Sequence, residues 1–170
     1  ERLISKYPGS SPDLVFQQGA LAFLKKDYSL AQKLFLEAAR RASETTAENA
    51  LFNENLAALN ANDASGAAAL IKEAAGSSRL RESILFEQAH YAAKRMAPQA
   101  AELLANFITL AETPALKTQA RLDQVEVALN LNPPDLETVQ AILPLLEKEQ
   151  LSPEQTMQLA RLNILEAESR

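Results

Sequence analysis

Residues 12–45 read PDLVFQQGALAFLKKDYSLAQKLFLEAARRASET, which is two helix-length segments separated by a short polar turn. The first segment opens with Ser11 followed by Pro12 and an acidic residue, a combination typical of a helix N-terminus. The turn at Asp27 leaves too few residues for anything but a direct reversal of the chain. The stretch therefore predicts helices over 12–25 and 28–42 that pack as an antiparallel hairpin.

The second helix of this hairpin carries a pattern that recurs along the chain. Four sets of apolar residues share the offsets +3, +4 and +7, which place each set on one helical face. The sets are Ala31, Leu34, Phe35, Ala38; Ala67, Leu70, Ile71, Ala74; Ala100, Leu103, Leu104, Phe107; and Val139, Ile142, Leu143, Leu146. They start 36, 33 and 39 residues apart, a period typical of stacked helical hairpins. A single hairpin cannot bury its apolar face, whereas a stack of hairpins can.

Helix-breaking residues, namely Pro, Gly and the Asn-Asp pair, divide the remaining sequence into segments of similar length. It predicts further helices over 47–61, 64–75, 79–95, 98–112, 115–131, 135–149 and 153–168, with the stub of another at 1–6. We therefore expect an all-α chain that forms one repeat array over 1–170 and is part of a longer protein.

The composition excludes several classes of function. The chain has 170 residues, 47% of them hydrophobic, with no Cys, one His and a formal net charge of −5. No apolar run approaches the length of a transmembrane helix, so we expect no membrane span. Without Cys and with one His, thiolate, zinc and haem sites are not expected, and the acidic charge argues against nucleic-acid binding. We expect no cofactor, no metal and no catalytic residue.

Residues 12–45 resemble a tetratricopeptide (TPR) repeat. The residues that carry the resemblance match the family's small, aromatic and turn positions: Gly19, Asp27, Tyr28, Ala31, Phe35, Ala38. Within residues 48–81 the likeness is reduced to Asp63, Ala67 and Ala74, with Asn55 at the Gly position and Ala64 at the Tyr position.

Residues 81–114 keep Tyr91 and Ala100, and residues 115–149 fit by hydrophobic pattern alone. The resemblance implies a right-handed superhelical solenoid of about four hairpins, with repeats near 12–45, 48–81, 81–114 and 115–149 and a terminal helix at 153–168.

In a TPR array the first helices of the hairpins line a concave groove, so the resemblance also implies a binding surface. The residues that it places in the groove are Phe16, Ala20, Phe23, Asn49, Phe52, Asn53, Leu56, Asn60, Leu85 and Ala89. Phe16, Phe52 and Leu85 form an apolar stripe, of the kind that marks an interaction surface when exposed. The alternative is that a tight superhelix or the terminal helix packs over them.

Three side chains in the groove set are amides that share one helical face. Asn49, Asn53 and Asn60 could satisfy the N–H and C=O groups of an extended peptide. The simpler interpretation, which we favour, is solvation and turn formation near residues 60–63. The two-carboxylate clamp of some TPR domains is not expected, because Phe16, Glu82 and Phe86 stand at its basic positions.

His90 is the only imidazole, and we expect it to be a partly buried structural residue. The sequence holds no Gly-rich phosphate loop, no nucleophile elbow and no carboxylates at metal-ligand spacing.

The function expected from these observations is a non-catalytic scaffold that binds a protein or peptide segment in the groove. Two alternatives stay open: a self-associating spacer of an envelope complex that uses its open ends, or the substrate-recruiting arm of a larger enzyme. Residues 1–10, which end in KYPGS, are similar to repeat junctions of bacterial envelope TPR proteins. The expected location is therefore the periplasm or cell envelope, with the cytoplasm as the alternative.

Overall fold

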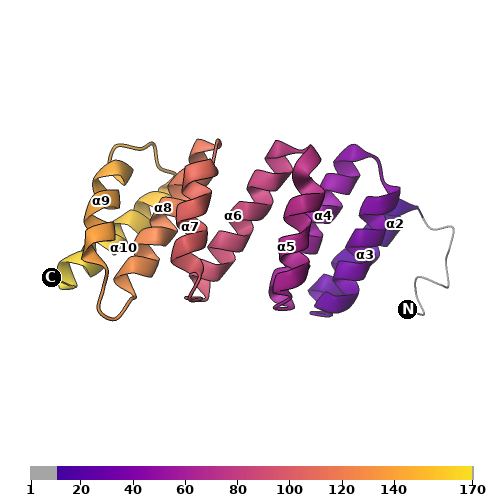
Figure 1. Ribbon diagram of the computed structural model, residues 1–170, viewed down its shortest axis with the longest axis horizontal. Coiled ribbons are helices and arrows are strands. Elements are labelled where there is room, and N and C mark those ends of the chain that lie inside the picture. The colour runs from indigo at the N-terminus through magenta and orange to yellow at the C-terminus, as the bar shows by residue number, and fades with distance from the viewer. Residues whose placement is uncertain (1–10, 170) are drawn as a thin grey trace. The chain divides into compact units, whose positions relative to one another are not determined.

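The computed structural model describes residues 11–169, apart from the side chains of Glu44 and Ala75. Over this range the chain is all-α, as predicted, and its nine α-helices pack in sequence order and antiparallel to their neighbours (Figure 1). The elements are α2 (Pro12–Leu24), α3 (Tyr28–Arg41), α4 (Glu44–Asn60), α5 (Ala64–Glu73), the 3₁₀ turn η1 (Ala74–Gly76), α6 (Ser78–Lys94), α7 (Ala100–Leu110), α8 (Pro114–Leu129), α9 (Leu136–Leu146) and α10 (Pro153–Glu168).

Every helix predicted after residue 11 is present, with ends that differ by up to three residues. The helix expected from 47 begins at Glu44, and the helix expected to reach 149 ends at Leu146. The stub expected at 1–6 lies outside the described residues.

The chain divides into two compact units, unit 1 ending at Ile84 and unit 2 beginning at Leu85. The helix α6 contributes its first part to unit 1 and the rest to unit 2. Each unit is described by itself below, and a single continuous array stays a prediction.

Short polar side chains fix where several helices begin. Asp27 caps α3 by accepting a hydrogen bond from the Leu30 N–H at 3.2 Å, and Asp63 caps α5 through the Gly66 N–H at 2.9 Å. Ser152 and Gln155 form a reciprocal capping box at the start of α10. These caps satisfy N–H groups that the first helical turn leaves unpaired.

The same turn closes α2, α4 and α6. In each case the second residue after the helix has a positive φ: 61° at Lys26, 57° at Asn62 and 51° at Met96. The next N–H then donates back to the helix, as from Asp27 to the Ala22 carbonyl at 3.0 Å. This left-handed residue ends the helix and sends the chain into the next, antiparallel one.

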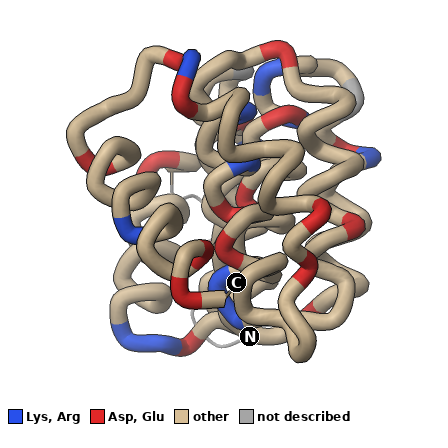
Figure 2. The backbone as a smooth tube through the Cα atoms, turned by 90° about the vertical axis from the view of Figure 1, so that its left-hand side faces the viewer, with Lys and Arg blue, Asp and Glu red and all other residues tan. Residues whose placement is uncertain are grey.

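Charged residues of both signs are interspersed along the backbone, with uncharged stretches between them (Figure 2). Within residues 11–169, no helix combines the length and the apolar character that crossing a membrane would need.

The core of unit 1 lies between its hairpins and is rich in alanine. Ala31, Ala38, Ala50 and Ala57 are fully buried together with Phe35. Small side chains at these positions let α2, α3 and α4 approach closely. A second cluster, made by Leu70, Ala74, Leu80 and Ile84, lies between α5 and the first part of α6.

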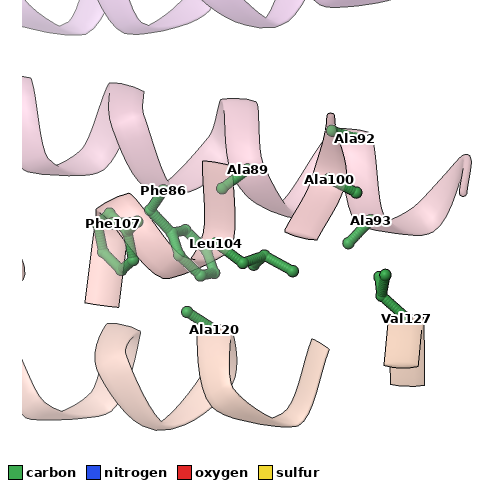
Figure 3. Close-up of a cluster of buried hydrophobic side chains, with 9 residues drawn as sticks. All are labelled: Phe86, Ala89, Ala92, Ala93, Ala100, Leu104, Phe107, Ala120 and Val127. Atoms are coloured by element: carbon green, nitrogen blue, oxygen red, sulfur yellow. The ribbon is translucent and has the colours of Figure 1, made fainter. Parts of the chain in front are cut away.

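The core of unit 2 has two clusters. In the first, Phe86 and Ala89 of α6, Leu104 and Phe107 of α7, and Ala120 of α8 point toward one another (Figure 3). The second joins α8, α9 and α10 through residues that include Leu122, Val139 and Leu162. The predicted apolar faces are on the inside throughout the described chain, with Ile71, Leu103 and Ile142 half-buried and the other members of the four sets buried.

Candidate functional site

The groove residues predicted on α2 lie at the edge of the unit 1 core. Phe16, Ala20 and Phe23 are each half-buried and pack against the buried cluster around Phe35. The Phe16 and Phe35 ring centroids are 5.3 Å apart, and the Phe23 and Tyr28 centroids are 5.2 Å apart. Phe16 and Phe23 therefore each have one side against the core and part of their surface open to solvent, whereas Phe35 is fully buried.

The helix α4 lies against α2 and brings Phe52 to the same unit. Phe52 is half-buried and packs on the cluster of Leu70 and Ile84. Asn49 is exposed, whereas Asn53, Leu56 and Asn60 are half-buried.

The amides of α4 are partly engaged within their own helix. The Asn53 Nδ2 donates to the Asn49 carbonyl at 2.7 Å, and the Asn60 Nδ2 donates to the Leu56 carbonyl at 2.8 Å. Bonds of this kind, back to the preceding turn, are local. A partner at this face would therefore meet the amide oxygens and only the remaining N–H of each side chain.

The last two predicted groove residues belong to unit 2. Leu85 is half-buried against the cluster of Phe86 and Leu104, while Ala89 is fully buried within it. Ala89 thus lies beneath the surface and supports it from below. The stripe expected over Phe16, Phe52 and Leu85 is divided between the units, and within unit 1 Phe16 and Phe52 pack against different clusters.

Unit 2 contains a polar network that the sequence did not predict. At its centre is Asp123 of α8, which is 1% exposed. One of its carboxylate oxygens lies 2.5 Å from the His90 Nδ1 of α6, and the other accepts a hydrogen bond from the Gln119 Nε2 at 3.2 Å. Burying a carboxylate is costly unless it is paired and hydrogen-bonded, and this one is both.

The contact with Asp123 affects the pKa and the orientation of the His90 imidazole. Its hydrogen bond to Asp123 raises the pKa of the imidazole above its usual value of 6.5, although burial acts in the opposite direction. The ring is stacked on Phe86, with centroids 5.4 Å apart and planes 20° apart. The imidazole is thus held on one face by Phe86 and on one edge by Asp123, and the Asp123 contact favours its charged form.

A row of glutamine amides extends the network to α10. The Gln119 Nε2 also donates to the Gln158 Oε1 at 3.1 Å, and the Gln119 Oε1 accepts from the Gln155 Nε2 at 3.3 Å. The Gln155 Oε1 accepts from the Ser152 N–H that starts α10. Amides in series in this way fix the spacing of α8 and α10.

Glu149, after α9, makes a separate contact to α8. It accepts hydrogen bonds from the Thr118 hydroxyl and from the Arg121 guanidinium. This contact ties the segment after α9 to the N-terminal half of α8.

Unit 1 has its own buried carboxyl group, Glu54 of α4. The residue is 8% exposed, and its Oε2 has no hydrogen-bond partner. The pKa of Glu54 is raised from 4.5 to about 7: burial is the largest cause, the neighbouring Glu73 and Asp63 also raise it, and Arg40 of α3 acts in the opposite direction. A group with such a pKa changes its charge near neutral pH.

Sequence reasoning placed His90 correctly as partly buried but missed Asp123, Gln119 and Glu54. The available signal was polarity inside an apolar face: Asp123 stands between Leu122 and Val125, both fully buried. Its partner is 33 residues away, so only the alignment of α6 with α8 could identify it.

No three His, Asp or Glu side chains among residues 11–169 are grouped in a way that could hold a metal ion. Comparison of the chain with protein-family models, with curated proteins and with solved structures finds no match.

Proposed function

We propose that this chain is a TPR-like scaffold that binds a segment of a partner protein and has no catalytic role of its own. The observation that carries the proposal is the state of the aromatic side chains on α2 and α4. Phe16 and Phe52 each pack one side on a core and keep the other side accessible. Rigidly held, partly exposed aromatic groups are typical anchors of protein–protein contacts.

The repeated turns support the repeat part of the proposal. Lys26, Asn62 and Met96 occupy the same position after α2, α4 and α6, 36 and 34 residues apart. That spacing fits the 34-residue TPR period. The likeness of residues 1–10 to junctions of envelope proteins makes the bacterial envelope the proposed location, with the cytoplasm as the alternative.

Paired pull-downs from the native organism would test the proposed surface. One bait carries Phe16→Ser and Phe52→Ser; the control bait carries Leu110→Ser, which removes an exposed leucine from α7. Loss of a partner by the double variant alone supports the proposal. Retention of the same partner by every bait contradicts it.

Because Phe16 and Phe52 also pack inside unit 1, circular dichroism must show equal helix content and thermal stability for each bait. Asn49→Lys provides a second test, since it adds a charged side chain to the same face at an exposed position. It removes no core contact and should also weaken partner retention.

Self-association is a second candidate, and one observation favours it. Leu14, Leu21 and Leu24 of α2 are exposed, although large apolar side chains are usually covered. Light scattering over a range of concentrations tests this candidate: a mass that rises with concentration and falls in Leu21→Ser supports it, and a constant monomer mass contradicts it.

A further inference from the structure

The charges of the unit 2 network are arranged in layers. The carboxylates lie deep, with side chains that are 0% exposed at Asp123 and 21% at Glu126. The cations lie above them, with side chains that are 29% exposed at His90, 48% at Lys94 and 69% at Arg161. Solvent, or a partner, therefore meets the positive groups first, although the whole chain has a net charge of −5.

Two carboxylates hold the three cations together. Asp123 pairs with His90 at 2.5 Å and with Lys94 at 3.7 Å, while Glu126 pairs with Lys94 at 3.0 Å and with Arg161 at 3.7 Å. Groups from α6 and α10 are thereby gathered over α8. Two carboxylates thus face three basic side chains, and the basic side chains are the more exposed of the two kinds.

Glu87 of α6 is the other carboxyl group that acts on His90. Burial raises the pKa of Glu87, and the negative charge of Asp123 raises it further. The positive charge of His90 acts in the opposite direction and lowers the pKa of Glu87.

The hydrogen-bonding groups of this network that remain unpaired are N–H donors. Both Asp123 oxygens and the side-chain oxygens of Gln119 and Gln158 already accept hydrogen bonds. The Nδ1 of His90 faces Asp123, so the Nε2, on the opposite edge of the ring, is directed away from it. The Gln158 Nε2 is also without a partner in the described chain, but it is buried and is not presented to a ligand. A ligand that completes this surface must bring acceptor oxygens.

We propose that this surface of unit 2 binds an acidic segment of a partner protein. One side-chain carboxylate of the segment accepts the His90 Nε2–H and lies beside the Lys94 ammonium and the Arg161 guanidinium. The partner class, a protein segment, comes from the scaffold proposal above. The site itself rests on α6, α8 and α10 alone and does not depend on Phe16 or Phe52.

NMR titration of the full chain tests the proposal directly. His90 is the only histidine, so its imidazole signals need no further assignment in a protein without a histidine tag. The probe is the peptide Gly-Glu-Gly-Glu-Gly, acetylated and amidated, compared with a Gly-Gln-Gly-Gln-Gly peptide blocked in the same way. A third peptide has the Gln sequence and a free carboxyl terminus.

We expect the Glu peptide to shift the His90 signals in a saturable way that weakens with added salt. The blocked Gln peptide should leave them unchanged. Unmoved signals, equal shifts with both blocked peptides, or a response confined to the free-terminus peptide would each overturn the proposal. None of these results would alter the test of Phe16 and Phe52, so the two proposals fail separately.

Charge-removing variants locate the site. Lys94→Gln should weaken binding of the Glu peptide about two- to fivefold, as expected for an exposed charge pair. The control Lys33→Gln removes the same charge from an exposed position on α3 and should have no such effect. Equal affinities for these two variants would contradict the assignment. Binding of the Glu peptide should be lost as pH rises and His90 loses its proton. In Asp123→Asn this loss should occur at a lower pH, because Asp123 is the positioning residue for the imidazolium.

Discussion

Gly19 of α2 and Phe35 of α3 are in direct contact: a Cβ at position 19 would stand 2.9 Å from both Cδ1 and Cε1 of the Phe35 ring. Phe35 is 1% exposed, so its ring is enclosed by the core. The close approach of these helices therefore depends on the missing side chain. A glycine inside a helix costs about 1 kcal/mol relative to alanine, and the contact with Phe35 gives the physical reason for Gly19.

The first prediction follows from that contact. Gly19→Ala should lower the free energy of unfolding by about 1 kcal/mol, since overpacking costs about 1–3 kcal/mol and the helix propensity gained returns about 1 kcal/mol. Gly76→Ala is the matched control, because a Cβ at Gly76 would meet nothing within 4 Å. Urea unfolding followed by circular dichroism measures both; a stabilised Gly19→Ala variant would show that Phe35 can move aside.

The second prediction concerns Glu54 and pH. Its pKa in the folded chain is about 7, above the ordinary 4.5, so between these values the folded state holds a proton that the unfolded state has released. Stability therefore falls as pH rises from 4.5 through 7, by roughly 3 kcal/mol in total. Glu54→Gln should remove this slope, whereas Glu48→Gln on the same helix should keep it. Identical slopes for the two variants would contradict the assignment.

The third prediction concerns the pKa of His90. Because the Asp123 hydrogen bond is the largest cause that raises it, Asp123→Asn should lower the imidazole pKa, and burial should then dominate. This raised pKa makes the folded state more stable at low pH. The contribution of His90 to the free energy of unfolding is complete below pH 6.5 and is lost as pH rises through the folded pKa. Titration of the single imidazole by NMR in both proteins checks the shift, and an unchanged pKa would argue against the pairing.

The fourth prediction concerns the cap of α5. Asp63 accepts hydrogen bonds from the Gly66 N–H at 2.9 Å and from the Gln32 side chain of α3 at 3.1 Å. These bonds lower the pKa of Asp63, so its stabilising effect is present above the ordinary 3.8 and is lost as pH falls through the lower, folded value. Asp63→Ala should cost about 1 kcal/mol, and Asp63→Asn, which keeps an acceptor, clearly less. Equal losses in thermal melts would mean that the effect of Asp63 does not come from its role as a hydrogen-bond acceptor.

The helices could be predicted because their signals are local. A helix cap is a hydrogen bond within one turn, as between Ser152 and Gln155 or between Asp27 and Leu30. The residues that start a helix are therefore close in the sequence. The apolar sets likewise lie within single helices, and most of their members are buried as expected. The ends were less accurate where a 3₁₀ turn, as at Ala74–Gly76, replaces the last helical residues.

The candidate surfaces were harder to predict because they depend on alignment between helices. The resemblance to TPR repeats gave the groove positions, but it did not show that Ala89 is covered or that Asn53 and Asn60 bond to their own helix. The pair of His90 and Asp123 joins residues from different hairpins, and no short-range pattern connects them. A buried polar position can be suspected from sequence, whereas its partner requires the packed structure.

The buried Asp123 also determines how α6 and α8 can be aligned. Two faces made only of leucine and alanine could slide by one turn, about 5.4 Å, and still exclude water. The same slide would take the Asp123 carboxylate away from His90 and Lys94 and leave it charged and unpaired in an apolar interior. The pair of His90 and Asp123 thus stabilises one alignment of the two helices and destabilises the alignments that are shifted by one turn in either direction.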